Sequence, residues 1–186
     1  MLKRGCIGKS LPAIRRRSTS PASGRPDIDI FFSYSHLDEK LRDKLEKHLT
    51  SLKRNGMVRV WYDRRIGAGS DVGSTIDAHI QSADLILILV SVNFLASDYC
   101  FSNELTVAMD RHRQGKARVI PIILRPVDWR DAPFRNLLAL PKDGKPITTW
   151  SNPDAAFFDV AQGIRNAVEE ISGRKGRARY SRRRRD

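Results

Sequence analysis

LILILVS, residues 85–91, is the stretch that decides the fold of this 186-residue chain. It is apolar without a break from Leu85 to Val90, whereas a strand with one face in water alternates apolar and polar residues. The run is also shorter than most helices of folded proteins. It therefore predicts a strand covered on both faces, the central strand of a parallel sheet.

Strand and helix patterns alternate on both sides of this central strand. IDIFFS (28–33) and VRVWYD (58–63) are typical of strands, and each is followed by apolar residues at helical spacing. A helix expected at 102–113 leads into a strand at RVIPIIL (118–124), and KPITTW (145–150) is expected to form a short edge strand. This order predicts an α/β fold, a flavodoxin-like, doubly wound sheet of five parallel strands flanked by helices, with strand order 2-1-3-4-5.

Capping residues indicate where the first and last helices begin. Asp38 is expected to cap the helix after the first strand, and Asn152-Pro153 is a strong start for the last helix. Gly173 is expected to end that helix. Its buried face is predicted to consist of Phe158, Ala161, Ile164, Val168 and Ile171.

The net charge of +13 is concentrated at the two ends of the chain. Residues 1–26 contain seven Lys/Arg and no acid, and residues 173–186 contain eight Lys/Arg and one acid, which leaves 27–172 nearly neutral. Both ends have few large apolar residues, so we expect two disordered basic segments around one domain at 27–172. They are either solvated tails or non-specific contacts to a polyanion such as RNA, DNA or an anionic membrane.

Membrane, disulfide and metal chemistry have little support in the sequence. No apolar run approaches the roughly 20 residues that a membrane-spanning helix needs. Cys6 and Cys100 are the only cysteines, too few for a disulfide framework or a cysteine metal cluster. We therefore expect a cytoplasmic protein without a metal site or a membrane span.

The predicted strand order brings two segments together at a crevice. In such sheets, ligands bind outside the carboxyl ends of the strands, where strands 1 and 3 diverge. Residues 33–36 leave the first strand there, and residues 91–104 leave the third. Glu104 is a lone acid in the apolar sequence around Leu105 and Ala108, so it is either a reactive carboxylate in the crevice or an acid that complements a helix dipole.

Four segments together resemble the motifs of a Toll/interleukin-1 receptor (TIR) domain of bacterial type over residues 27–172. They are DIDIFFSYSHLDE, WYDRRIGAGSD, SADLILILVSVNFLASDYCFSNEL and ARVIPIILRPVDW. The resemblance implies one of two functions. Some TIR domains cleave the nicotinamide–ribose bond of NAD⁺, and others are signalling scaffolds that act by TIR–TIR association.

The resemblance also implies site residues. In the enzymes the essential group is a Glu early in the helix after the third strand, a position that Glu104 occupies here. An aromatic residue often stands four positions earlier, where this chain has Cys100 preceded by Tyr99. NAD⁺ would be a substrate, with no separate cofactor. The expected binding residues are Phe32, Ser33, Tyr34, Ser35, Tyr99 and Cys100.

Some of these residues have simpler interpretations. Phe32 is equally well explained as a core residue. A Cys–His nucleophile made of Cys100 and His36, with Asp38 orienting the imidazole, is a weaker hypothesis, because a buried cysteine is usually an apolar filler.

The loop after the second strand has glycines without the spacing of a phosphate loop. The resemblance implies that this loop borders the active site and makes assembly contacts, whereas its composition alone indicates a connector with solvated charges. The residues concerned are Asp63, Arg64, Arg65, Ile66, Gly67 and Gly69.

Our first hypothesis is therefore an NAD⁺ hydrolase that is activated by self-association, in signalling or immune defence. The alternative is a non-catalytic TIR adaptor that works by TIR–TIR interaction. A third possibility is a nucleic-acid-associated module that acts through its Arg-rich ends.

Overall fold

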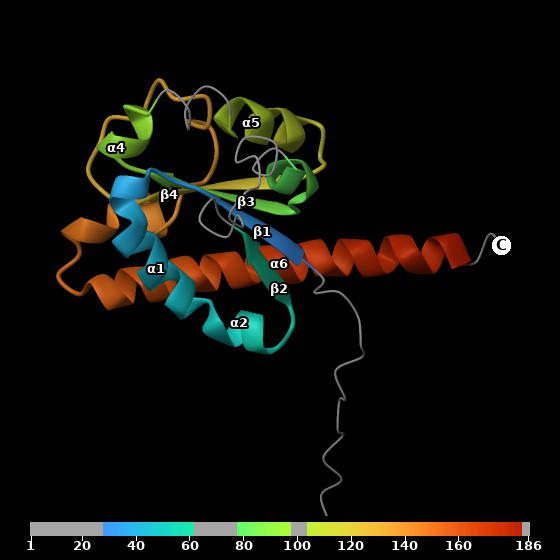
Figure 1. The fold of residues 1–186 in the computed structure, drawn as a ribbon. Coiled ribbons are helices and arrows are strands. Elements are labelled where there is room, and N and C mark those ends of the chain that lie inside the picture. The colour runs from blue at the N-terminus through green and yellow to red at the C-terminus, as the bar shows by residue number, and fades with distance from the viewer. Residues whose placement is uncertain (1–27, 62–77, 98–103, 184–186) are drawn as a thin grey trace, which may run out of the picture.

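A computed structural model describes residues 28–61, 78–97 and 104–183. Its sheet has four parallel strands in the order β2-β1-β3-β4 (Figure 1). The strands are β1 (Ile28–Ser33), β2 (Val58–Trp61), β3 (Leu85–Val90) and β4 (Arg118–Ile123). The α/β class and the order of the first four strands are confirmed. The fifth strand is not found among the described residues.

Short 3₁₀ turns replace the expected edge strand at 145–150. Within those positions the chain forms η5 (Ile147–Thr149), which follows η4 (Lys142–Gly144). Before both of them, Leu140 makes an isolated parallel bridge to Ile122 of β4. Pro141 and Pro146 have no N–H to donate to a neighbouring strand. Asp143 and Gly144 have φ angles of 60° and 63°, which turn the chain away from an extended path.

Helices cover both faces of the sheet (Figure 1). On one face lie α1 (Glu39–His48), α2 (Thr50–Arg54) and α6 (Pro153–Arg183), and on the other lie α4 (Val92–Leu95) and α5 (Leu105–Arg113). Residues 78–82 are also helical. Every residue of β3 is fully buried and its side chains alternate between the two core clusters, so β3 is the central, doubly covered strand that its sequence predicted.

The same alternation runs along β1 and decides which side chains can reach the candidate site. Phe31 belongs to the core cluster on the α5 face of the sheet. Phe32 and Tyr34 belong to the cluster on the α1 and α6 face. Ser33 falls between them, so the strand directs its hydroxyl to the α5 face.

Asp38 does not cap α1, contrary to the prediction. It ends a 3₁₀ turn, η1 (His36–Asp38), and its carboxylate makes no capping hydrogen bond. Donors from distant parts of the chain occupy that carboxylate instead, including the Ser91 hydroxyl at 2.5 Å. Tertiary contacts therefore outweighed the local capping preference.

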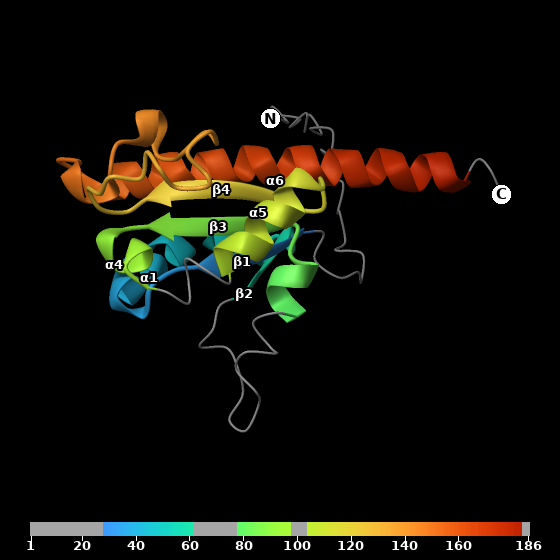
Figure 2. The same cartoon turned by 90° about the horizontal axis from the view of Figure 1, so that it is seen from above.

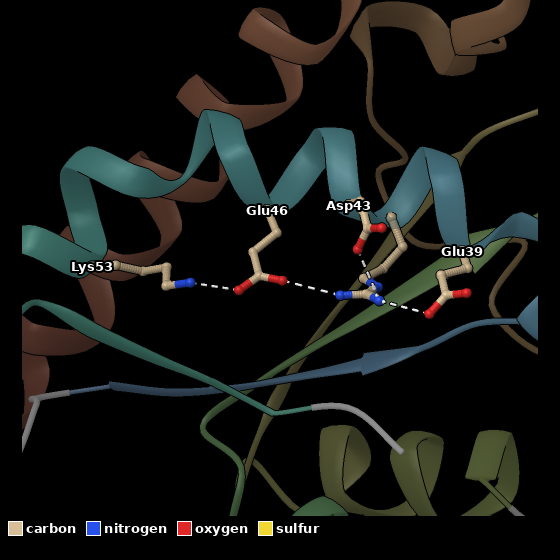
Figure 3. Close-up of polar contacts among 5 residues, drawn as sticks. Glu39, Asp43, Glu46 and Lys53 are labelled. Carbon is tan, nitrogen blue, oxygen red and sulfur yellow. Dashed lines mark hydrogen bonds and ion pairs between the residues drawn. The ribbon is translucent and has the colours of Figure 1, made fainter. Parts of the chain in front are cut away.

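A buried arginine joins α1 to the end of β1. Arg42 is 2% exposed and pairs with three acids of its own helix, of which Glu46 also pairs with a lysine of α2 (Figure 3). Its guanidinium lies 5.2 Å from the centre of the Tyr34 ring. Because a buried cation needs compensating charge, the acids balance the charge of the Arg42 guanidinium while it packs against Tyr34. The pairing acids and the lysine are Glu39, Asp43, Glu46 and Lys53.

The last helix begins as predicted but packs with a different phase. Oδ1 of Asn152 accepts the backbone N–H of Asp154 at 3.0 Å and that of the next residue at 3.4 Å, which confirms the cap. Phe157 is fully buried, whereas Phe158 is 59% exposed, so the predicted placement of Phe158 in the core is wrong. The buried residues of this helix are Ala156, Phe157, Val160, Ile164, Ala167 and Val168.

We expected the helix to end at Gly173 and a disordered segment to begin there, but α6 continues through Gly173 to Arg183. Its last turns project past the sheet in both views (Figures 1 and 2). One glycine costs a helix only about 1 kcal/mol, and arginine is a good helix former. Within the described residues no helix combines the length and the apolarity required to cross a membrane. Residues 1–26 and 184–186 lie outside the described parts, so their predicted disorder stays a prediction.

Candidate functional site

The candidate site lies where β1 ends and α5 begins. The hydroxyl of Ser33, the last residue of β1, donates a hydrogen bond of 2.5 Å to Oε2 of Glu104. Glu104 immediately precedes Leu105, the first residue of α5. The structure thus brings together the two segments that the strand order predicted to be neighbours.

Both members of this pair are withdrawn from water. Ser33 is fully buried and Glu104 is 7% exposed. Leu105 and Ala108, on the first turn of α5, are buried as well. Removing a carboxylate from water is costly unless it accepts hydrogen bonds, and the Ser33 hydroxyl supplies one. The amino end of α5 adds the positive end of a helix dipole beside the same carboxylate.

A carboxylate in this setting can do two things chemically. It can accept hydrogen bonds from the hydroxyls of a ligand, and it can stabilise positive charge that develops close to it. The second effect is stronger in a site that excludes water than at an exposed surface, because the local dielectric is lower. The arrangement suits a reaction whose transition state carries positive charge.

The predicted binding residues of β1 do not all face Glu104. Ser33 contacts it, whereas Phe32 and Tyr34 lie in the core cluster on the opposite face of the sheet. Phe32 is 1% exposed, a placement that favours its interpretation as a core residue. Ser35 is buried, and its carbonyl accepts the backbone N–H of Asp38 at 2.8 Å, which closes the turn after β1.

The other predicted site residues fall outside the described parts of the chain, so their roles stay predictions. They are Tyr99 and Cys100 before α5, and Asp63, Arg64, Arg65, Ile66, Gly67 and Gly69 in the loop after β2. The Cys100–His36 pairing therefore also stays a hypothesis; His36 itself is exposed. In the described parts of the chain, no group of His, Cys, Asp and Glu is arranged to hold a metal ion.

Sequence reasoning missed a second polar cluster at the carboxyl edge of the sheet. Oδ2 of Asp38 accepts hydrogen bonds from the Ser91 hydroxyl at 2.5 Å and from the Asn93 amide at 3.2 Å. Oδ1 of Asp38 accepts one from Nε of Arg125 at 2.8 Å. Ser91 directly follows β3, and Arg125 lies two residues beyond β4. The available signal was the presence of polar residues just after two predicted strands, where ligands of parallel sheets bind.

Two hollows of the described surface lie away from Ser33 and Glu104. One of about 520 Å³ lies between β4, α6 and residues 137–140. Another of about 360 Å³ lies at the amino edge of the sheet, against Asp84, Arg118 and the last part of α6. Neither presents a buried carboxylate with a hydroxyl partner, so the chemistry favours the β1–α5 junction over these hollows.

Comparisons with known protein sequences agree with the motifs. The sequence model of the TIR-domain family matches residues 30–157. The uncharacterized protein y4lF of Sinorhizobium fredii (strain NBRC 101917 / NGR234) is 56% identical over 143 residues, which are 77% of this chain and 44% of that protein. The chain thus spans less than half the length of this relative.

Among solved structures, the TIR domains of the activated Roq1 resistosome, which directly recognizes the pathogen effector XopQ, match 78% of this chain and 84% of theirs. The sequence identity is 17% and the TM-score is 0.45.

Proposed function

This chain belongs to the TIR-domain family, and we propose that it is an NAD⁺ hydrolase with Glu104 as its catalytic carboxylate. The family includes enzymes that cleave the nicotinamide–ribose bond of NAD⁺. The observation that carries the proposal is the buried Ser33–Glu104 pair at the carboxyl edge of the sheet, where α/β folds of this kind bind ligands.

The chemistry of the bond explains why one carboxylate is sufficient. The nicotinamide of NAD⁺ is cationic and leaves as a neutral molecule, so the leaving group needs no proton. Positive charge develops on the ribose instead, in an oxocarbenium-like transition state. Glu104 would accept hydrogen bonds from the ribose hydroxyls and stabilise that charge. Water then adds to C1′ of the ribose and loses a proton, giving ADP-ribose, whereas attack from within the same molecule gives a cyclic isomer.

Ser33 positions the carboxylate in this mechanism. The backbone of β1 fixes the position of its hydroxyl, which donates a hydrogen bond of 2.5 Å to Oε2 of Glu104. A carboxylate held in this way does not have to reorganise when charge appears on the substrate, and that preorganisation is the source of most electrostatic catalysis.

Activation by self-association is part of the proposal. The loop that contains Asp63 to Gly69 would border the site and provide contacts between TIR domains, so that assembly completes the active site. A hydrolase controlled in this way would work in the cytoplasm in signalling or immune defence, where substrate consumption has to wait for a trigger.

The test is NAD⁺ turnover by the purified chain at high protein concentration, with chromatography of the products. We expect the wild type to release nicotinamide, and Glu104→Gln to lower the rate by about 100-fold or more, as expected for loss of a preorganised electrostatic group. Glu169→Gln is the matched control, because it makes the same change at an exposed position of α6. Equal turnover by Glu104→Gln and Glu169→Gln would refute the catalytic role of Glu104.

The non-catalytic alternative makes the opposite prediction. A TIR adaptor would self-associate at the same protein concentration without consuming NAD⁺. Sedimentation of the same samples separates the two outcomes, because it reports assembly independently of turnover. Assembly without nicotinamide release would replace the hydrolase by the adaptor.

A further inference from the structure

Asp38 is a buried carboxylate that the proposed mechanism does not use. Its side chain is fully buried, and its two oxygens accept hydrogen bonds from Ser91, Asn93 and Arg125. These donors follow β3 and β4, while Asp38 itself follows β1. One carboxylate therefore ties together the exits of three neighbouring strands at the edge that carries Glu104.

Arg125 differs from the other two donors because it is a cation that is only partly engaged. It donates through Nε, and its side chain is 44% exposed. Within the described residues, its two terminal nitrogens have no hydrogen-bond or ion-pair partner. A guanidinium anchored through Nε has a fixed orientation, and its terminal N–H groups form a fork that matches two oxygens of a phosphate.

The sheet register places this fork on the same edge of the sheet as the Ser33–Glu104 pair. Ser33 is level with Ile88 of β3, and Ile88 is level with Pro121 of β4. Arg125 follows Pro121 by four residues and its side chain returns to Asp38, which belongs to the segment that leaves β1. The cation thus lies on the same edge as Glu104, across the neighbouring strands and farther along the strand direction than Ser33.

We propose that Arg125 binds the pyrophosphate of the dinucleotide, with Asp38 as the residue that positions it. This inference rests on the proposed function and adds a second contact to it. Glu104 engages the ribose at the reacting bond, and Arg125 holds the doubly charged linker farther along the same molecule. The ligand class is a nucleoside diphosphate, which Arg125 recognises by charge and by two parallel N–H···O bonds.

The experiment measures ADP binding by calorimetry, which needs no turnover. We expect Arg125→Ala to weaken ADP binding by about 10- to 100-fold, the usual effect of losing a charge-assisted hydrogen bond. Glu104→Gln should bind ADP like the wild type, since ADP lacks the nicotinamide ribose. Arg130→Ala is the matched control, because Arg130 lies in the same loop, is exposed and pairs with Asp128 rather than with Asp38.

A double variant separates binding from folding. Arg125→Ala leaves the buried Asp38 carboxylate without its counter-ion, so this variant should also unfold at lower urea concentration. In Asp38→Asn/Arg125→Ala the Asn oxygen can still accept from Ser91 and Asn93 and no buried charge remains, so stability should recover while ADP binding does not. Recovery of both would show that Arg125 is only structural.

Two further results would overturn the proposal. One is equal ADP affinity in Arg125→Ala and Arg130→Ala, and the other is a wild type that does not bind ADP. In steady-state assays, Arg125→Ala should raise KM for NAD⁺ more than it lowers kcat. If the chain hydrolyses NAD⁺ but its ADP affinity does not depend on Arg125, the proposed function stands and this inference fails. If the chain is inactive but binds ADP through Arg125, this inference stands and the proposed function fails.

Discussion

Replacing Ser33 by alanine should cost the protein more stability when residue 104 is charged than when it is neutral. The Ser33 hydroxyl donates a hydrogen bond of 2.5 Å to Oε2 of Glu104, and both residues are buried. Ser33→Ala removes the donor without a large change in volume, so the main effect is the loss of one hydrogen bond to the Glu104 carboxylate. Glu104→Gln keeps the length of the side chain and an oxygen acceptor but removes the charge.

The expected magnitudes follow from the type of hydrogen bond. Hydrogen bonds to charged groups contribute about 1.5–3 kcal/mol and neutral ones about 0.5–1.5 kcal/mol. Ser33→Ala should therefore lower the free energy of unfolding by about 1.5–3 kcal/mol in the wild type and by about 0.5–1.5 kcal/mol in Glu104→Gln. With an m value of about 2 kcal/mol/M, the wild-type midpoint in urea should fall by about 1 M.

Urea unfolding of the four proteins at pH 7, followed by circular dichroism, measures this difference. The m value has to stay constant across the set, because a change would mean that the unfolded or native state has altered. A coupling energy of about 1 kcal/mol is expected, whereas unrelated sites add within about 0.5 kcal/mol. Additive effects would show that the hydroxyl does not stabilise a charged carboxylate, and would remove the positioning role given to Ser33.

Three further predictions concern parts of the fold away from the site. Phe157→Ala should cost about 3–5 kcal/mol and Phe158→Ala less than about 0.5 kcal/mol, since only the first is buried; the reverse order in urea unfolding would mean that the phase of α6 is wrong. Asn152→Ala should cost about 1 kcal/mol through loss of the helix cap, and Asn152→Asp should not. Burial, and then the nearby Arg59, lower the pKa of His79, so the unfolded chain binds its proton more readily than the folded one. The stability that this group contributes is complete above about pH 6.5 and is lost as the pH falls. His79→Gln should therefore flatten the decline of the free energy of unfolding between about pH 7.5 and 5, and parallel curves for the wild type and the variant would contradict this.

The fold was predictable where one strong pattern decided each element. The apolar run at 85–90 had no other reasonable interpretation, and the helix start at Asn152 depended only on neighbouring residues. Residues 145–150 were misassigned because their apolar content was given more weight than Pro141, Pro146 and the turn between them.

Side-chain partners were harder to predict than elements, because they depend on contacts across the sheet. Asp38 was suited to a helix cap by its local sequence, but three donors from later segments bind it. The two adjacent residues Phe157 and Phe158 fit a helical stripe almost equally well, so only packing against the sheet could choose between them. Arg125 follows a predicted strand, but nothing in its neighbourhood indicates that its partner lies 87 residues earlier.

The two buried carboxylates at the carboxyl edge differ in what a ligand would have to displace. Asp38 is held by a guanidinium as well as by a hydroxyl and an amide, so a neutral ligand that took the place of the guanidinium would leave the buried Asp38 carboxylate without its counter-ion. Glu104 accepts the Ser33 hydroxyl at Oε2, and a carboxylate has lone pairs for more than one donor. Under the proposed mechanism a ribose hydroxyl would bind beside Ser33, so the contact that positions the carboxylate stays in place. Glu104 is therefore the carboxylate that a sugar can engage, whereas Asp38 keeps the strand ends and Arg125 in position.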